Sequence, residues 1–159
     1  MNNNVKLFVM DVDGTLTDGK VYMGHNGEVM KAFSVKDGYG IRNILLPKGI
    51  RPVIITGRSS EILNRRCAEI GIVDVYQNID DKLAVLEKLC KNYNISFAEI
   101  AYIGDDLNDM SCMMKVLEYK GLIGCPADAT NEVKNVATYV CKKNGGDGAV
   151  REFIEYIVE

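Results

Sequence analysis

The sequence predicts a single α/β domain of the Rossmann-like type, in which helices flank a parallel β-sheet. Short apolar runs of strand length recur along the chain, and segments with helical periodicity separate them. The runs are nearly continuous in apolar residues rather than alternating, as expected of strands that helices cover on both faces. This order of strands and helices is typical of repeated βα units.

Apolar runs of strand length are the predicted strands, and the first is expected near the centre of the sheet. They are Val5–Met10, Pro52–Thr56, Val73–Tyr76, Ile100–Ile103 and Leu122–Gly124. The helices expected between and after them cover residues 38–46, 60–70, 82–93, 106–116, 130–135 and 149–158. The clearest is 82–93, because Leu83, Leu86 and Leu89 fall on one helical face.

The segment between the first two strands departs from this pattern. Two β-prone arms flank Asn26-Gly27, which is a two-residue hairpin signal. We expect a small flap over about residues 19–34, above the sheet edge where ligands bind in this architecture. The stretch between Asp13 and Thr56 is too short to hold a separate cap domain as well. The expected organisation is therefore one domain over residues 1–159, ending in a C-terminal tail of about residues 144–159.

Composition and charge exclude several classes of protein. The net charge of −3 without a basic patch argues against a nucleic-acid partner. No apolar run is long enough to span a membrane, and the N-terminus lacks the basic and apolar regions of a signal peptide. The five cysteines are odd in number and show no C-x-x-C spacing, which favours reduced thiols over a disulfide framework or zinc site. We expect a cytoplasmic protein that acts on a small molecule.

Two aspartates one residue apart, Asp11 and Asp13, end the first predicted strand. Carboxylates this close repel each other unless a cation lies between them. Mg²⁺ is the expected cation, since it prefers carboxylates together with phosphate and water oxygens. The alternative is a loop of acids that caps a helix.

The next two strand ends carry further polar groups. Thr56 and Gly57 offer a hydroxyl and an approachable amide to an anion, although a simple turn into a helix capped by Ser59 is the alternative. Asp105, Asp106 and Asp109 follow the strand 100–103, where the helix dipole alone would also favour acids. The carboxyl ends of these parallel strands converge on one crevice.

Lys82 opens a helix and would add a positive charge to the same crevice, unless it lies on a solvated helix face. In this order, D11-V-D-G-T-L-T17, T56-G-R58, Lys82 and G104-D-D-L-N-D109 resemble the motifs of the haloacid dehalogenase (HAD) superfamily of phosphohydrolases. The resemblance implies a HAD-type sheet and a Mg²⁺ cofactor.

In that family Asp11 would be the nucleophile that forms an aspartyl-phosphate, and Asp13 would be the general acid and base. The resemblance further implies two sets of supporting residues. The phosphoryl group would be held by Thr56, Gly57 and Lys82, and Mg²⁺ by Asp11, Asp105 and the carbonyl of Asp13. Asp109 and Asn108 would act one layer further out, orienting Lys82 or a metal-bound water.

Further stretches resemble the branch that dephosphorylates sugar acids, especially the 3-deoxy-D-manno-octulosonate 8-phosphate (KDO 8-phosphate) phosphatases of lipopolysaccharide precursor biosynthesis. They are Y22-M-G-x-N-G-E28, K31-A-F-x-V-x-D-G-Y-G-I-R42 and G145-G-x-G-A-V-R-E152. Members of this branch are homotetramers in which a neighbouring subunit closes the active site. The resemblance therefore implies a homotetramer and a sugar-acid phosphate as the substrate.

Substrate recognition is expected from a small set of residues: Arg58, Arg66, Asp37, Gly38 and Arg151. A guanidinium matches a carboxylate in geometry, but each arginine is also compatible with a solvated helix face, and Asp37 with a helix N-cap. Arg58 favours an eight-carbon over a nine-carbon sugar acid, because the nine-carbon phosphatases tend to carry an acid at this place. The alternatives are a nine-carbon sugar-acid phosphatase, a non-catalytic oligomerisation module associated with a cytidylyltransferase, and a phosphomutase or different small-phosphate hydrolase.

Overall fold

Six parallel strands form the central sheet of the structure, a computed structural model that describes residues 4–159. The first three residues of the expected domain lie outside that range. In spatial order the strands are β5 (Asp74–Tyr76), β4 (Arg51–Ile55), β1 (Leu7–Met10), β6 (Ile100–Ile103), β7 (Leu122–Cys125) and β8 (Tyr139–Val140). The predicted parallel sheet and the inner position of the first strand are confirmed.

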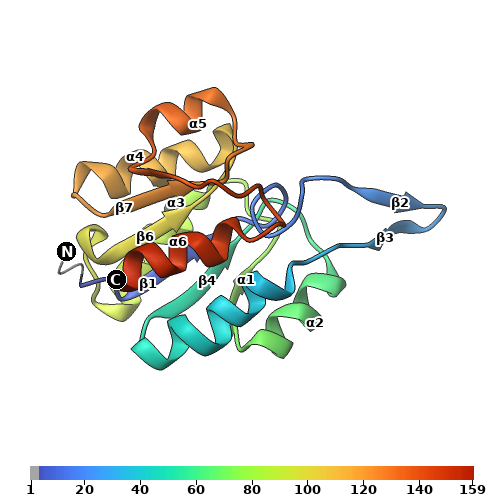
Figure 1. The fold of residues 1–159 in the computed structure, drawn as a ribbon, viewed down its shortest axis with the longest axis horizontal. Helices are drawn as coiled ribbons and strands as arrows, with labels where there is room; N and C mark the ends of the chain where they lie inside the picture. Colours follow the sequence, from blue (N-terminus) through green and yellow to red (C-terminus); the bar gives the residue numbers. More distant parts are fainter. Residues whose placement is uncertain (1–3) are drawn as a thin grey trace.

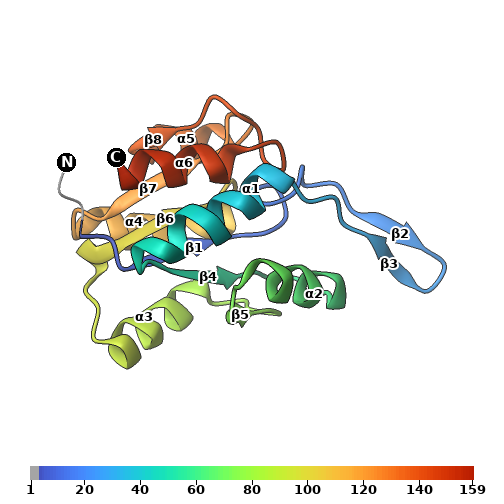
Figure 2. The same cartoon turned by 60° about the horizontal axis from the view of Figure 1, so that its bottom comes forward.

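Helices cover both faces of this sheet (Figures 1 and 2). Phe8 and Met10 of β1 point to one layer, which contains α1 (Val35–Tyr39), α2 (Glu61–Ile70) and α6 (Ala149–Val158). Side chains alternate along a strand, so Leu7 and Val9 point to the other layer. That layer contains α3 (Lys82–Tyr93), α4 (Met110–Glu118) and α5 (Asn131–Val136). Burial on both faces explains the nearly continuous apolar runs.

The first helical segment begins earlier than predicted. Ser34 is its N-cap and accepts a hydrogen bond from the backbone N–H of Asp37, so the helix starts at Val35 rather than at Gly38. It continues as a π-helical segment, Gly40–Leu45, and a 3₁₀ turn, Leu46–Lys48. The glycines in this stretch mark close packing against Arg66 and Arg151 and not the start of the helix.

The other elements lie close to their predicted bounds, with four differences. Helix α2 is capped by Ser60 rather than Ser59, and α4 is preceded by a 3₁₀ turn, Leu107–Asp109. A further 3₁₀ turn, Phe97–Glu99, leads into β6. Strand β8 was not predicted, because two residues carry no periodicity. Of the segment expected as a C-terminal tail, residues Ala149–Val158 form α6, whose Phe153 is fully buried.

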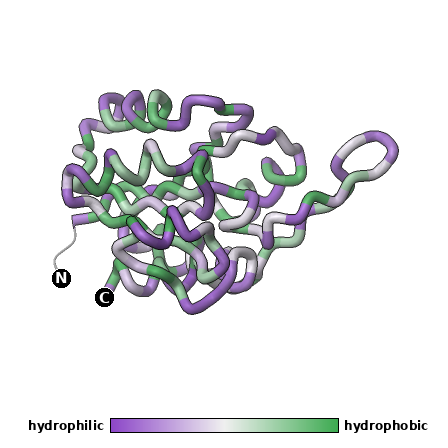
Figure 3. The backbone as a smooth tube through the Cα atoms, turned by 90° about the horizontal axis from the view of Figure 1, so that it is seen from above, coloured by the Kyte–Doolittle hydropathy of each residue, from purple (hydrophilic) through white to green (hydrophobic). Residues whose placement is uncertain are grey.

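The predicted hairpin is present as β2 (Tyr22–Gly24) and β3 (Gly27–Met30), and it projects from the body of the domain (Figure 1). Its turn consists of His25 and Asn26, one residue earlier than predicted, because Gly24 pairs with Gly27. Gly27 has a φ of 114°, a conformation that favours glycine at the end of the turn. Figure 3 shows hydrophobic stretches along the arms of this flap.

Among residues 4–159, no helix combines the length and the apolar character needed to cross a membrane. All five cysteines are buried and unpaired.

Candidate active site

The carboxyl ends of β1 and β6 and the start of α3 meet at one place. Asp11 follows β1 directly, is 4% exposed, and donates its backbone N–H to the carbonyl of Ile103 at 3.1 Å. Lys82 begins α3 after the N-cap Asp81, and its side chain is 2% exposed. The Nζ atom of Lys82 lies 2.8 Å from Oδ1 of Asp11, so the topology joins two residues that are far apart in the sequence.

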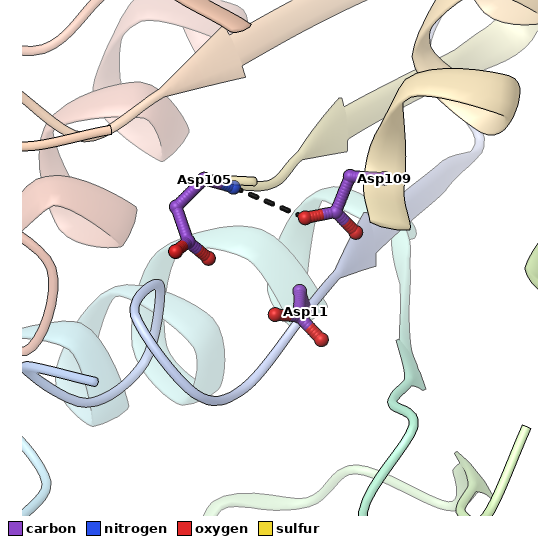
Figure 4. Close-up of side chains that lie close together, drawn as sticks. All are labelled: Asp11, Asp105 and Asp109. Carbon is purple, nitrogen blue, oxygen red and sulfur yellow. Dashed lines mark hydrogen bonds between the residues drawn. The ribbon is translucent and has the colours of Figure 1, made fainter. Parts of the chain in front are cut away.

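Asp109 is fully buried beneath this pair, and donors surround its carboxylate. Its Oδ1 accepts hydrogen bonds from Lys82 Nζ at 2.8 Å and from the Tyr102 hydroxyl at 2.7 Å. Its Oδ2 accepts from the backbone N–H of Asp105 at 3.1 Å, the bond drawn in Figure 4. Asp109 therefore orients Lys82 and fixes the loop after β6.

Asp11, Asp105 and Asp109 form a compact carboxylate cluster, with one oxygen of each within 4.8 Å of the others (Figure 4). Burial and the nearby Asp11 charge raise the pKa of Asp105 to about 8. Burial and Asp109 raise the pKa of Asp11 to about 6, against the opposing effect of Lys82. Because donors already occupy both oxygens of Asp109, Asp11 and Asp105 are the members best able to ligate a cation.

A hard divalent cation fits this donor set. All the available ligand atoms are oxygens, and a cation would offset the burial and the mutual repulsion that raise the pKa values of Asp11 and Asp105. Lys82 donates to Oδ1 of Asp11 and Thr15 donates to Oδ1 of Asp105, so neither of these bonds uses the Oδ2 atoms.

The loop after Asp13 shapes the floor of the site. Gly14 has a φ of 98°, and a Cβ atom there would collide with the carboxylate of Asp105. Thr15 donates its hydroxyl to Oδ1 of Asp105 at 2.9 Å. Thr15 was not among the predicted site residues, although its place directly after D-x-D-G was a usable signal. Gly14 and Thr15 therefore position Asp105, although Asp105 lies 90 residues after Thr15 in the sequence.

Thr56 and Gly57 lie at the carboxyl end of β4, next to β1 in the sheet. Thr56 is buried and exchanges backbone hydrogen bonds with Tyr76 and Ile79. Gly57 is exposed, and the nearest atom to a Cβ built on it is the Ile79 carbonyl oxygen at 3.7 Å. The structure thus brings both residues to the same edge as Asp11, with open space in front of Gly57.

The flap contributes a second set of charges that sequence reasoning missed. Lys31 Nζ lies 2.6 Å from Oδ1 of Asp13 and 3.1 Å from Oε2 of Glu28. Glu28 Oε1 accepts a hydrogen bond from the Ser60 hydroxyl at 2.8 Å. Arg58 lies beside them, with Nε 3.8 Å from Oδ2 of Asp13. Lys31 and Glu28 both lie in stretches that resemble the sugar-acid phosphatases, but neither was assigned a role from the sequence.

The other predicted substrate residues lie together between α1, α2 and α6. Arg66 Nη1 pairs with Glu69 at 2.9 Å, and its side chain fills the space beside Gly38. Asp37 Oδ1 accepts the backbone N–H of Arg151 at 2.8 Å. Within residues 4–159 their polar partners are one another and neighbouring helix residues, rather than the carboxylate cluster.

Of the last two predicted residues, Asp37 is buried and Asn108 is exposed. Burial of Asp37 is the main cause that raises its pKa to about 6, although backbone N–H groups of Arg151 and Gly148 act in the opposite direction. Asn108 is exposed on the 3₁₀ turn before α4.

Known proteins resemble the chain over nearly its whole length. A model of the haloacid dehalogenase-like hydrolases matches residues 67–154. A 3-deoxy-D-manno-octulosonate 8-phosphate phosphatase of Salmonella typhi is 44% identical over 155 residues, which cover 98% of this chain and 80% of the relative. The crystal structure of the enzyme of that name from Yersinia pestis is 42% identical, with a TM-score of 0.92 and coverage of 98% of this chain and 82% of that one.

A second solved structure carries ligands. The 3-deoxy-D-manno-octulosonate 8-phosphate phosphatase from Moraxella catarrhalis, in complex with a magnesium ion, a phosphate ion and a KDO molecule, is 41% identical. Its TM-score is 0.91, and the match covers 98% of this chain and 87% of that one. These matches show that the chain belongs to the haloacid dehalogenase-like hydrolase family, among its phosphoric monoester hydrolases.

Proposed function

We propose that the protein is a Mg²⁺-dependent phosphatase that hydrolyses 3-deoxy-D-manno-octulosonate 8-phosphate to KDO and phosphate. The observation that carries the proposal is the Asp11 carboxylate, held by Lys82 through Oδ1 beside the half-buried Asp105. The relatives named above support this substrate, and the Moraxella complex supports Mg²⁺ as the cofactor.

Asp11 is the proposed nucleophile. Lys82 at 2.8 Å from Oδ1 orients the carboxylate and leaves Oδ2 to attack phosphorus. The bond from Asp11 to phosphorus forms as the bond from phosphorus to the sugar oxygen breaks, which gives an aspartyl-phosphate. Thr56, the amide of Gly57 and Lys82 hold the phosphoryl oxygens, where negative charge is greatest.

Asp13 is the proposed general acid and base. In the first step its carboxyl group donates a proton to the departing sugar oxygen. In the second step its carboxylate takes a proton from a water molecule, whose oxygen attacks phosphorus as the bond to Asp11 breaks. Phosphate is released, and both Asp11 and Asp13 return to their starting forms.

The carboxylates of Asp11 and Asp105 and the carbonyl of Asp13 are the proposed ligands of Mg²⁺. When bound, Mg²⁺ supplies positive charge that offsets the charge of the phosphoryl oxygens. Asp109 has both oxygens engaged, which supports the outer role expected for it. The outer role of Asn108 stays a prediction.

Arg58 is the proposed reader of the substrate carboxylate. Its side chain is 47% exposed, and its contacts with Asp13 and Glu28 at 3.8 and 3.5 Å are long for hydrogen bonds. It is therefore free to turn toward a ligand and form the bidentate pair that a carboxylate accepts. Arg66, Asp37, Gly38 and Arg151 stay predictions for substrate contact.

A cytoplasmic homotetramer in lipopolysaccharide precursor synthesis is the proposed setting, on the strength of the family resemblance. The flap supports an assembly, because Met23 and Val29 are each 64% exposed although they are large apolar residues. A single domain over residues 1–159 without a cap needs another surface to cover its site, and a neighbouring subunit would provide it.

Phosphate release from KDO 8-phosphate tests the proposal. With Mg²⁺ the wild-type protein is expected to turn over, and Asp11→Asn is expected to abolish turnover without loss of folded structure. A folded wild-type protein that releases no phosphate from any sugar-acid phosphate would favour the oligomerisation module instead. A higher kcat/KM for a nine-carbon acid 9-phosphate in the same assay would overturn the assignment based on Arg58.

A further inference from the structure

Lys31 occupies an unusual place for a lysine on a projecting hairpin. Its side chain is 2% exposed, and its ammonium lies between two carboxylates, Asp13 Oδ1 at 2.6 Å and Glu28 Oε2 at 3.1 Å. Burying an ammonium is costly unless it is paired and hydrogen-bonded. The pairing with both carboxylates offsets this cost and fixes where the Lys31 side chain lies.

We propose that Lys31 is a positioning residue that orients the Asp13 carboxyl group for proton transfer and makes this orientation depend on the docking of the flap. The inference rests on the proposed function, because it assigns Asp13 the role of acid and base. Arg58, the other cation near Asp13, lies 3.8 Å from Oδ2 and is half-exposed. Among residues 4–159, Lys31 makes the short contact with the Asp13 carboxyl group.

The contact distinguishes the two oxygens of Asp13. Because Lys31 donates to Oδ1, that oxygen is engaged and the carboxyl plane is fixed. The exchanged proton therefore sits on Oδ2, which no donor among residues 4–159 reaches within hydrogen-bond distance. Holding a catalytic group in its reactive orientation in advance removes part of the entropic cost of the reaction.

A chain of contacts connects this orientation to the flap and to α2. Glu28 is the second carboxylate that pairs with the Lys31 ammonium, and its Oε1 atom accepts a hydrogen bond from the Ser60 hydroxyl at 2.8 Å. Ser60 holds the N-cap position of α2 without a capping side-chain hydrogen bond, a few residues after Thr56 and Gly57, and its backbone N–H donates to Gln77 Oε1 at 2.6 Å. When the flap is docked, Lys31 is held on Asp13; displacement of the flap would release Asp13.

The leaving group provides a selective test of this role. An alkyl phosphate needs the Asp13 proton, because the departing sugar alkoxide is a strong base. The nitrophenolate of p-nitrophenyl phosphate leaves without protonation. Loss of Asp13 positioning therefore slows the alkyl ester far more than the aryl ester, whereas general damage to the site slows both.

The experiment measures kcat and KM of wild type, Lys31→Met and Lys20→Met on KDO 8-phosphate and on p-nitrophenyl phosphate, with Mg²⁺. Lys20 is a matched control, since it is an exposed lysine near the flap, 3.7 Å from Asp18. Lys31→Met is expected to lower kcat on KDO 8-phosphate by about 10²-fold, with less than a ~5-fold change on the aryl ester. KM should change little, and Lys20→Met should match wild type on both esters.

Two further variants keep the inference falsifiable. Glu28→Gln removes the second anchor of Lys31 but leaves its contact with Asp13, so a smaller loss confined to the alkyl ester is expected even if Lys31→Met does not fold. Lys31→Met in an Asp13→Asn background should cause no further loss on the alkyl ester. Equal losses on both esters in folded variants, or full additivity with Asp13→Asn, would overturn the inference.

Failure of the proposed function gives a different result. A wild-type protein that cleaves p-nitrophenyl phosphate but not KDO 8-phosphate would disprove the proposed substrate. The role of Lys31 would then be tested with glycerol 3-phosphate as the alkyl ester. The ratio of alkyl to aryl turnover decides the inference in that case as well. A Lys31→Met variant with the wild-type ratio would contradict it whichever sugar is cleaved.

Discussion

Replacement of Lys82 by methionine is expected to destabilise the metal-free protein in a pH-dependent way. Lys82 is 2% exposed and donates to Asp11 and Asp109, each at 2.8 Å. Although burial opposes it, the charges of Asp109 and Asp11 raise the pKa of Lys82 above its usual value. The ammonium is therefore charged throughout the range from pH 5 to 8. Methionine keeps most of the volume but removes the charge that the two buried carboxylates face.

The size of the effect follows from the loss of one partner in a buried ion pair. Such a loss costs about 3–5 kcal/mol, because it leaves an uncompensated buried charge. Without Lys82 the pKa of Asp11, already about 6, is expected to rise further. Asp11 then binds a proton as the pH falls, which removes the unpaired charge. The cost is therefore largest near pH 8 and smaller near pH 5.

Urea unfolding in the presence of a chelator, at pH 8 and at pH 5, measures this free energy. Lys88→Met is the control, since Lys88 is exposed on the same helix and its loss should change the free energy of unfolding by less than ~0.5 kcal/mol. A loss below ~1 kcal/mol for Lys82→Met at pH 8, or an equal loss at both pH values, would refute the reasoning on the buried pair.

Three further predictions concern the carboxylate cluster. Mg²⁺ affinity, measured by calorimetry, should rise between about pH 6 and pH 8. The reason is that the pKa values of Asp11 and Asp105 are raised to about 6 and about 8, so protons compete with the metal below these values. An affinity independent of pH would contradict this prediction. Gly14 has a φ of 98° and faces Asp105, so Gly14→Ala should displace the Asp105 carboxylate. Weaker Mg²⁺ binding and a lower kcat/KM are expected, with only a small decrease in Tm. Unchanged Mg²⁺ binding would contradict the close contact between residue 14 and Asp105. Tyr102→Phe removes the 2.7 Å hydrogen bond to Asp109 and should lower the free energy of unfolding by about 1–3 kcal/mol at neutral pH, whereas a neutral result would mean that Asp109 does not depend on this donor.

The raised carboxyl pKa values also set the pH dependence of the metal-free fold. Folded Asp11 and Asp105 hold their protons to higher pH than the unfolded chain does, where the ordinary value is 3.8. Their contribution to stability is therefore full below about pH 4 and is lost as the pH rises toward 8. A bound cation reverses this trend, because it favours the ionised forms.

Most of the sheet was predictable because its strands are buried on both faces. The apolar runs of β1 and β6 have no other stable position, and the parallel arrangement then brings Asp11 and Asp105 to the same edge. Lys82 was predictable for the same reason, since it begins the helix that follows β5. Local pattern and chain topology together were enough for these residues.

The remaining features depend on contacts that local sequence does not encode. Lys31 reaches Asp13, and Glu28 reaches Lys31 and Ser60, only because of how the base of the hairpin lies against the sheet edge, and no periodicity predicts that placement. Asp37 was expected to be a substrate residue, with a helix N-cap as the alternative, but its carboxylate accepts a hydrogen bond from the start of α6. Its partner Arg151 is 114 residues away, which only the folded chain reveals.

Direct detection of the phosphoenzyme tests the central claim, that Asp11 is the nucleophile of a phosphatase. Wild-type protein with KDO 8-phosphate and Mg²⁺ would be quenched in acid on the millisecond scale, and its peptides analysed by mass spectrometry. One phosphoryl group is expected on Asp11 of the wild-type protein and none on the Asp11→Asn variant. Phosphate release with the phosphoryl group on another residue, or sustained turnover by Asp11→Asn, would contradict it.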